Sequence, residues 1–132
     1  MEECRVLYGE QLMKTVRVGI MSKEAYKQRT IDIAKGLYVP KADEPKIWFE
    51  SMKSMAQILS NENQALLKTI LDHEPKSLKE LEALTGRAKS NLSRTLKTLE
   101  RYGIVELHKS NNALIAKVKA THFKVEFGFE AA

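Results

Sequence analysis

Leucine recurs in steps of four and three residues between residues 89 and 102, and this spacing constrains the fold more than any other feature. Leu92, Leu96 and Leu99 fall on one face of a helix, whereas the charged residues point largely elsewhere. Gly103 is a natural stop for such a helix. The sequence therefore predicts a helix that packs one apolar face on a domain and carries its charges on the other faces.

A capped helix precedes this segment, and a pair of strands follows it. Ser77 and Glu80 have the spacing of a capping box, in which each side chain satisfies a free backbone N–H, and Gly86 ends the short helix. Residues 104–119 indicate two strands around a turn, which is a β-hairpin. Three helices, the last two joined by a tight glycine-containing turn, and then a hairpin are the element order of a winged helix-turn-helix.

The N-terminal part of the chain has a different pattern. Residues 12–20 alternate apolar and polar side chains and predict a half-buried strand, and residues 23–35 predict a helix. Residues 37–46 contain two prolines and four charges, so we expect an extended connector. The predicted fold class is α+β, a winged helix-turn-helix over residues 47–132 with an N-terminal strand-helix extension over residues 1–46 for dimerisation or partner binding.

Two further helices are expected between the connector and the capping box. The aromatic residues of 47–50 indicate a short anchor in the core, and residues 51–59 predict a helix. The apolar residues of that helix are spaced three and four apart and should form one buried stripe, namely Met52, Met55, Ala56 and Leu59. The next helix should begin at Asn61 and end before Pro75.

Apolar and polar residues alternate most regularly near the C-terminus. One face of the expected strand carries Phe123, Val125, Phe127 and Phe129. An isolated strand exposes unpaired backbone groups, so this strand and the one at residues 12–20 must pair with each other, with a second subunit or with another protein. We expect pairing across a dimer first and strand addition by another protein second. For the last strand alone, packing on the hairpin is as well supported as pairing across a dimer.

The distribution of charge favours an acidic partner. The chain has 22 Lys and Arg residues against 17 Asp and Glu, a net charge of +5. Most of this excess lies in residues 87–101, where five basic residues are opposed only by Glu100. The concentration of charge on one predicted helix favours nucleic acid as the partner.

Other classes of function have little support in the residues. The single cysteine, Cys4, excludes an internal disulfide and a cysteine-based zinc site. We find no spacing of metal ligands, phosphate loop or nucleophile elbow, and therefore expect no catalytic residue, cofactor or metal. No apolar stretch reaches the length of a membrane span and no secretory signal is evident, so we expect a cytoplasmic protein without membrane contact.

A winged helix-turn-helix reads DNA with the N-terminal half of its last helix. Here Ser90, Asn91 and Arg94 are donors suited to base edges, whereas Lys89 and Lys97 are point charges suited to phosphates. The hairpin tip would lie over the adjacent minor groove or the backbone. The complete set of predicted DNA-binding residues is Ser77, Arg87, Lys89, Ser90, Asn91, Ser93, Arg94, Lys97, Lys109, Asn111 and Asn112.

The run from Leu81 to Val105 resembles the helix-turn-helix of MarR/ArsR-type winged-helix regulators, most specifically in Leu-Ser-Arg-x-Leu-Lys-x-Leu-Glu-x-x-Gly-Ile-Val. More narrowly, the order of strand, helix, proline connector, Trp48-Phe49-Glu50-Ser51 and winged helix is similar to a group of small MarR-like DNA-binding proteins. These are regarded as transcriptional regulators or as antitoxins of type II toxin-antitoxin pairs. The resemblance covers residues 13–127 and implies operator binding as a homodimer, autoregulation and a cognate toxin.

Two features depart from the pattern of these relatives. Ala88 stands where relatives often have a capping Ser or Thr, so the following helix lacks a cap worth about 1 kcal/mol. Residues 1–12 precede the resemblance, and we interpret them as an extension without a role in the family.

The predicted function is that of a sequence-specific DNA-binding repressor that autoregulates its operon as the antitoxin of a type II toxin-antitoxin pair. Its expected partners are double-stranded operator DNA, a second copy of the chain and a toxin protein. One alternative is a MarR/ArsR-like regulator without a toxin, and another is a winged helix that serves only protein–protein contact. An enzyme with a cleft between the two halves has the least support.

Overall fold

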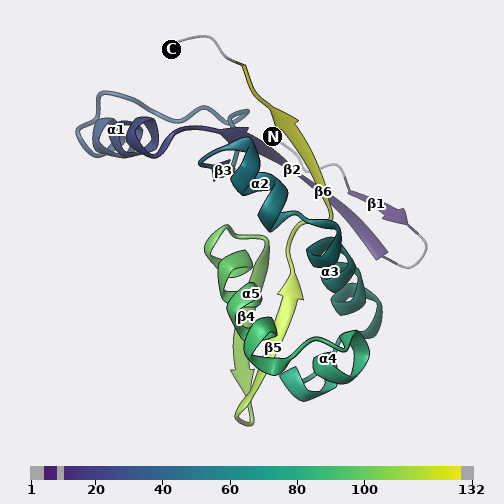
Figure 1. The fold of residues 1–132 in the computed structure, drawn as a ribbon. Helices are drawn as coiled ribbons and strands as arrows, with labels where there is room; N and C mark the ends of the chain where they lie inside the picture. The colour runs from purple at the N-terminus through teal and green to yellow at the C-terminus, as the bar shows by residue number, and fades with distance from the viewer. Residues whose placement is uncertain (1–4, 9–10, 129–132) are drawn as a thin grey trace.

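The computed structural model describes residues 5–8 and 11–128 of the chain, which form a mixed α+β fold (Figure 1). A sheet and helix α1 occupy one end of the molecule, and a helical body with a β-hairpin occupies the other. The elements follow the order β1 Arg5–Tyr8, β2 Gln11–Ile20, α1 Lys23–Ala34, β3 Ile47–Phe49, α2 Met52–Ile58, α3 Asn61–His73, α4 Leu78–Thr85, α5 Lys89–Arg101, β4 Val105–Ser110, β5 Ala113–Val118 and β6 His122–Glu126.

The expected helices and the hairpin are present, with ends that differ from the predictions by one or two residues. Serine determines where most of the helices begin. The hydroxyl oxygens of Ser22, Ser51, Ser60 and Ser77 each accept a hydrogen bond from the backbone N–H three residues later. Each cap satisfies one of the donors that the first turn of a helix leaves free.

The sheet is built around β2. Val18 is paired in parallel with both Ile47 of β3 and Val125 of β6, so these strands lie on opposite edges of β2. The N–H of Thr121 donates to the carbonyl of Lys14 at 2.9 Å and guides the chain into this pairing. Our first expectation, pairing across a dimer, is therefore wrong for β2, because β3 and β6 of the same chain flank it, whereas β6 pairs with β2 on one side alone among the described strands.

Two segments have more structure than the sequence indicated. Residues 47–49, expected as an aromatic anchor, form strand β3. Residues 5–8 form β1, which pairs antiparallel with residues 11–14 of β2. Part of the segment interpreted as an extension therefore belongs to the sheet.

One core connects the sheet with the helical body. Leucines at 92, 96 and 99 are all buried, as their spacing predicted, and the ring of Phe49 stacks on Tyr102 with centroids 4.8 Å apart. The buried cluster comprises Val18, Ile47, Phe49, Leu66, Leu67, Ile70, Leu81, Leu92, Leu96, Leu99, Ile104 and Val105. Residues on both sides of the expected boundary at 46 thus share the same core.

Helix α2 does not bury the stripe predicted for it. Met55 and Leu59 pack against the core, but Met52 is 47% exposed and Ala56 is also exposed. The prediction is wrong for these two residues because α2 packs on the core through the side that carries Met55, Ile58 and Leu59, and Met52 and Ala56 lie beside that side. Phe129 and Cys4 lie outside the described residues.

Helix α1 is held by a polar cluster rather than by the core. The guanidinium of Arg29 lies 5.3 Å from the ring centre of Trp48 and 3.4 Å from the carboxylate of Glu44. The hydroxyl of Tyr38 also donates to Glu44. Gly19 leaves room for Trp48, because a Cβ at this position would lie 2.4 Å from the indole.

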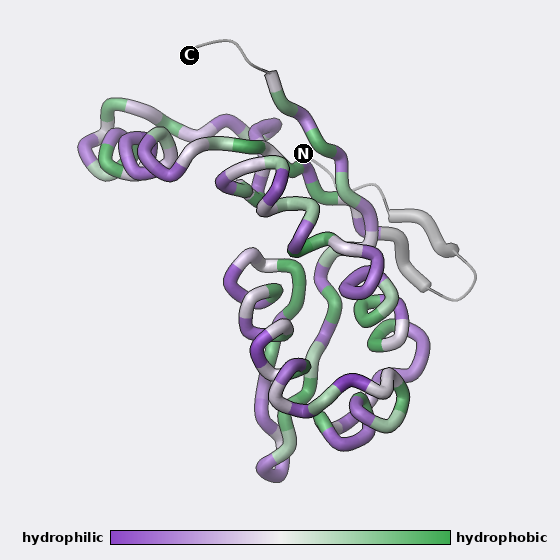
Figure 2. Tube along the Cα trace, viewed as in Figure 1, coloured by the Kyte–Doolittle hydropathy of each residue, from purple (hydrophilic) through white to green (hydrophobic). Residues whose placement is uncertain are grey.

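Hydropathy follows this division (Figure 2). Apolar segments gather where α3, α5 and the hairpin meet, whereas α1 is mostly hydrophilic. In the part of the chain that the structure describes, no helix combines the length and apolar character needed to cross a bilayer.

Candidate nucleic-acid interface

Helix α5 and the hairpin tip lie at the same end of the molecule (Figure 1). A tight turn through Gly103 joins α5 to β4, which runs in the opposite direction. The 13 residues of α5 and the 6 residues of β4 each span about 20 Å. The N-terminal end of α5 therefore lies toward the hairpin tip, which projects beyond it (Figure 1).

The buried leucines determine which residues of α5 face solvent. Ser90, Arg94 and Lys97, spaced four and three apart, lie on the side of the helix opposite the leucines and are exposed. Arg101 continues this line one turn further on. Among the described residues, neither Arg94 nor Lys97 has a carboxylate within ion-pair distance. We call Ser90, Arg94, Lys97 and Arg101 the basic stripe of α5.

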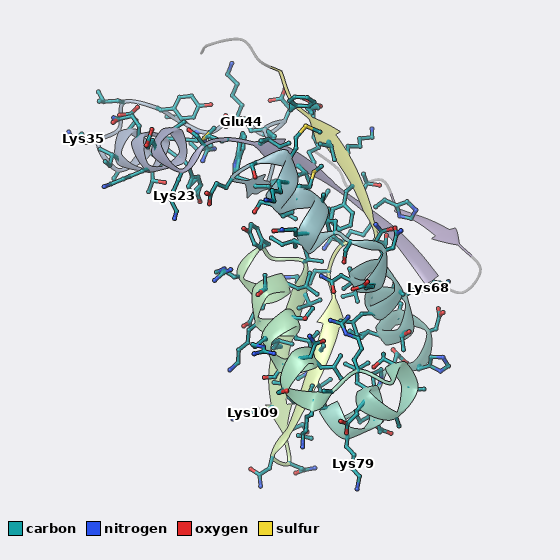
Figure 3. All side chains as sticks on the ribbon, viewed as in Figure 1. Lys23, Lys35, Glu44, Lys68, Lys79 and Lys109 are labelled. Atoms are coloured by element: carbon teal, nitrogen blue, oxygen red, sulfur yellow. The ribbon has the colours of Figure 1, made fainter. Side chains whose placement is uncertain are left out.

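The hairpin ends in a two-residue turn that only a few residue types accommodate. Asn111 and Asn112 have φ angles of 52° and 64°, and Ser110 and Ala113 are paired on either side of them. Asparagine tolerates this left-handed conformation better than most residues. Both asparagines and the neighbouring Lys109 are exposed. Figure 3 shows Lys109 near the tip of the hairpin and Lys79 on α4 at the same end of the molecule.

Arg87 is directed into the protein. It is half-buried, and its guanidinium donates to Asn91 Oδ1 at 2.8 Å, to Thr95 Oγ1 at 3.0 Å and to Asn63 Oδ1 at 3.3 Å. It therefore joins α3 to α5 and occupies the acceptor of Asn91, another predicted DNA-binding residue. No local sequence pattern predicts the contact between Arg87 and Asn63, because Asn63 lies 24 residues earlier in the chain.

The remaining predicted residues have varied surroundings. Ser77 is half-buried and caps α4 by accepting from the N–H of Glu80, as predicted, while the Glu80 carboxylate accepts from Lys76 rather than from Ser77. Ser93 is half-buried on the flank of α5, and Lys89 is exposed.

The start of α5 lacks a side-chain cap. Ala88 makes no capping hydrogen bond, as the sequence indicated, and the helix still begins at Lys89. A carboxylate oxygen of Glu82 on α4 accepts from the backbone N–H of Lys89 at 3.2 Å. A negative charge at this position stabilises the N-terminal end of a helix. Glu82 therefore performs part of the role of the absent cap, which sequence spacing did not reveal.

A shallow groove of about 490 Å³ lies beside this end of the molecule, between the end of α3 and the hairpin. Its lining combines Ile70, Pro75, Lys76, His108 and Lys117 with neighbouring apolar residues. The described residues contain no group of three or more His, Cys, Asp or Glu side chains placed to hold a metal ion.

The chain is thus an α+β protein with a core-anchored basic helix beside a β-hairpin. A family model described as HVO_A0114 matches residues 58–125, slightly more than half of the chain, and the protein belongs to this family. The match runs from the end of α2 to β6 and includes the whole candidate interface. No curated protein and no solved structure matches the chain.

Proposed function

We propose that this protein is a winged helix-turn-helix regulator that binds double-stranded DNA with α5 and the hairpin tip. The observation that carries the proposal is the basic stripe, whose Arg94 and Lys97 are exposed and have no ion-pair partner among the described residues, on a helix whose N-terminal end and the hairpin tip lie at the same end of the molecule (Figure 1). Three buried leucines hold α5, so the face of the helix that carries these side chains is fixed before any partner arrives. Such preorganisation is what entry of a helix into a major groove requires.

The proposed contacts differ in kind. Arg94 has the planar fork that pairs with the O6 and N7 atoms of guanine, and Ser90 is a short donor in the preceding turn. Lys97 and Lys89 bind phosphates, and Lys109, Asn111 and Asn112 reach the backbone or the adjacent minor groove. Arg87 and Ser77 are half-buried and support this surface through the hydrogen bonds described above, whereas the exposed Asn91 accepts from Arg87 and offers its amide N–H groups to a base edge.

We further propose that the protein acts in the cytoplasm as a homodimeric repressor of its own operon and as the antitoxin of a toxin-antitoxin pair. The resemblance of residues 13–127 to MarR-like regulators and antitoxins supports this part. The surface around α1 offers room for a protein partner, because Tyr26, Leu37 and Val39 are 44%, 74% and 76% exposed. A regulator without a toxin is the alternative, and the presence of a toxin-like reading frame beside the gene would distinguish the two.

The test is selection of bound fragments from genomic DNA with the purified protein, followed by affinity measurements at several salt concentrations. We expect Arg94→Ala to weaken binding to the selected site by about 1–3 kcal/mol and to change binding to random DNA little. Lys97→Ala should weaken binding to both and lower the salt slope by about 1. Lys27→Ala, an exposed substitution on α1, is the matched control and should change neither.

Two results would contradict the proposal. Equal losses on selected and random DNA in Arg94→Ala would remove its base-reading role. Weak binding that does not depend on salt would show that phosphate contacts are absent, and the winged helix would then serve protein–protein contact.

A further inference from the structure

Strand β6 lies at the edge of the sheet, with β2 on one side. The carbonyl of Arg17 accepts from Lys46 on the β3 side, so Val16 and Val18, its neighbours on β2, direct their backbone groups to β6. In each opposed pair of a parallel ladder, only one of the two residues directs its backbone N–H and C=O groups toward the other strand. Because Phe123 is opposite Val16 and Val125 is opposite Val18, the N–H and C=O groups of Phe123 and Val125 point away from β2. The same alternation applies to Phe127 if the strand continues.

The residues of this edge are complementary to themselves. The sequence from residue 123 to residue 127 is Phe-Lys-Val-Glu-Phe. When it is placed antiparallel to its own copy with Val125 opposite Val125, Phe123 lies opposite Phe127 and Lys124 lies opposite Glu126. Every apolar residue then meets an apolar one, and every charge meets its opposite.

Side chains on both faces of β6 are exposed to solvent, so a second strand could cover them. Val125 is 43% exposed, although it lies on the face that continues into the core through Val18, and Phe127, directly after the end of β6, is 58% exposed. On the other face Glu126 pairs with Arg17, and Lys124 is exposed without an ion-pair partner among the described residues. A neighbouring strand would cover the two apolar side chains and supply a carboxylate to Lys124.

We propose that β6 pairs antiparallel with β6 of a second copy about Val125, so that two chains form one continuous sheet around a two-fold axis. The outward N–H and C=O groups of Phe123 and Val125 are those that this register joins, with Phe127 added when the pairing extends β6 by one residue, and β6 keeps its bonds to β2. An interface in which the same strand meets itself is the usual form of a symmetric dimer. The proposal specifies the homodimer of the proposed function, but it does not depend on DNA binding.

The symmetry also places the two helical bodies. The two-fold axis of an antiparallel strand pair is perpendicular to the sheet. Rotation about this axis does not exchange the two faces of the sheet. The core-facing sides of both copies therefore point in the same direction, and both helical bodies lie on one side of the continuous sheet.

Charge reversal tests the register. Lys124→Glu and Glu126→Lys each create two like-charge pairs across the axis, and each should weaken self-association of the purified chain about tenfold or more in sedimentation equilibrium without DNA. Mixed in equal amounts, the two variants should associate as well as the wild type, because every cross-strand pair is then complementary. Circular dichroism shows whether the variants retain the fold, and rescue by mixing requires that they do.

A cysteine at the axis tests the same arrangement independently. In a Cys4→Ser background, Val125→Cys places two cysteines opposite each other with Cα atoms about 5.5 Å apart, within the range of a disulfide. We expect rapid intermolecular cross-linking under mild oxidation. Lys124→Cys is the matched control and should cross-link slowly, because residue 124 is opposite residue 126.

Several outcomes would overturn the proposal. If the wild-type chain stays monomeric at high concentration, β6 does not pair with a second copy, and the free edge of β6 would instead bind a strand of a different protein. A dimer that both charge variants form unchanged, or whose variants do not recover on mixing, would place the interface elsewhere. Because these measurements omit DNA, they fail or succeed separately from the test of DNA binding.

Discussion

Helices α1 and α5 are similar in length, with 12 and 13 residues, but they are held in place by different forces. Three leucines of α5 are buried in the core, whereas no residue of α1 is buried. Helix α1 depends instead on the cap at Ser22 and on the contacts of Arg29 with Glu44, Tyr38 and Trp48. The core therefore fixes the orientation of α5, and a few part-buried polar contacts position α1.

This difference matters for how each helix meets a partner. A helix anchored by the core presents its outer side chains in one arrangement, which suits the reading of a rigid ligand such as DNA. A helix with no buried residue can shift more easily than one anchored in the core, because few buried apolar contacts oppose the movement. Such a helix suits a partner that reshapes the surface it binds.

The largest effect should come from weakening the anchor of α5. Leu96 is 1% exposed, and Leu96→Ala should lower the free energy of unfolding by about 2–5 kcal/mol, since it removes buried methyl groups and leaves a cavity. Urea denaturation followed by circular dichroism measures this change. Leu84→Ala, the same substitution at a side chain that is 45% exposed, is the control. Equal losses in both variants would contradict the anchoring of α5 by its leucines.

A smaller effect should come from Arg87, which joins α5 to α3. Arg87→Ala removes three hydrogen bonds of a charged donor and should lower the free energy of unfolding by about 1–3 kcal/mol. Arg94→Ala changes an exposed arginine of α5 and should alter stability by no more than about 0.5 kcal/mol. If Arg87→Ala weakened DNA binding without changing stability, Arg87 would be a DNA contact rather than a support.

The smallest effect should come from the cluster that holds α1. Hydrogen bonds from the Tyr38 hydroxyl, the Lys41 N–H and Arg29 lower the pKa of Glu44 below its ordinary value of 4.5. Because the folded-state pKa is the lower one, the stabilisation by Glu44 is complete above about pH 4.5 and is lost as the pH falls through the folded-state value. We expect α1 to loosen in this range while the helical body stays folded.

Trp48 offers a direct readout, because it is the single tryptophan of the chain and lies against Arg29. Its fluorescence and the hydrogen exchange of α1 amides should change together in acid, without a change in the amides of α5. Glu44→Gln should abolish this pH dependence. A transition that persisted in Glu44→Gln would assign the effect to a different group.

The sequence predicted best where structure depends on neighbours along the chain. The spacing of leucines in α5, the capping serine of α4 and the asparagines of the hairpin turn all act within a few residues. For this reason helices α3, α4 and α5, the hairpin and the exposed side of α5 could be anticipated. These local signals also placed Arg94 and Lys97 on the exposed side of α5.

The failures involve contacts between distant segments. The pairing of Val16 with Phe123 joins residues at the two ends of the chain, and periodicity cannot identify a strand's partner. The role of Arg87 depends in the same way on Asn63, which no spacing rule connects with it. Met52 was expected to be buried because spacing shows which residues share a face but not how far the neighbouring surface extends.

The pairing of β2 with β6 also determines the order in which parts of the chain can fold during synthesis. Roughly 100 residues separate the two strands, and a ribosome adds about 5–20 residues per second, so the β6 side of β2 stays open for about 5–20 s. During that time an unpaired apolar strand edge is exposed to other nascent chains. The helical body and the hairpin can fold from nearby residues meanwhile, and closure of the sheet is the last step. We therefore expect this edge of β2 to be the part of the nascent chain that most needs a chaperone.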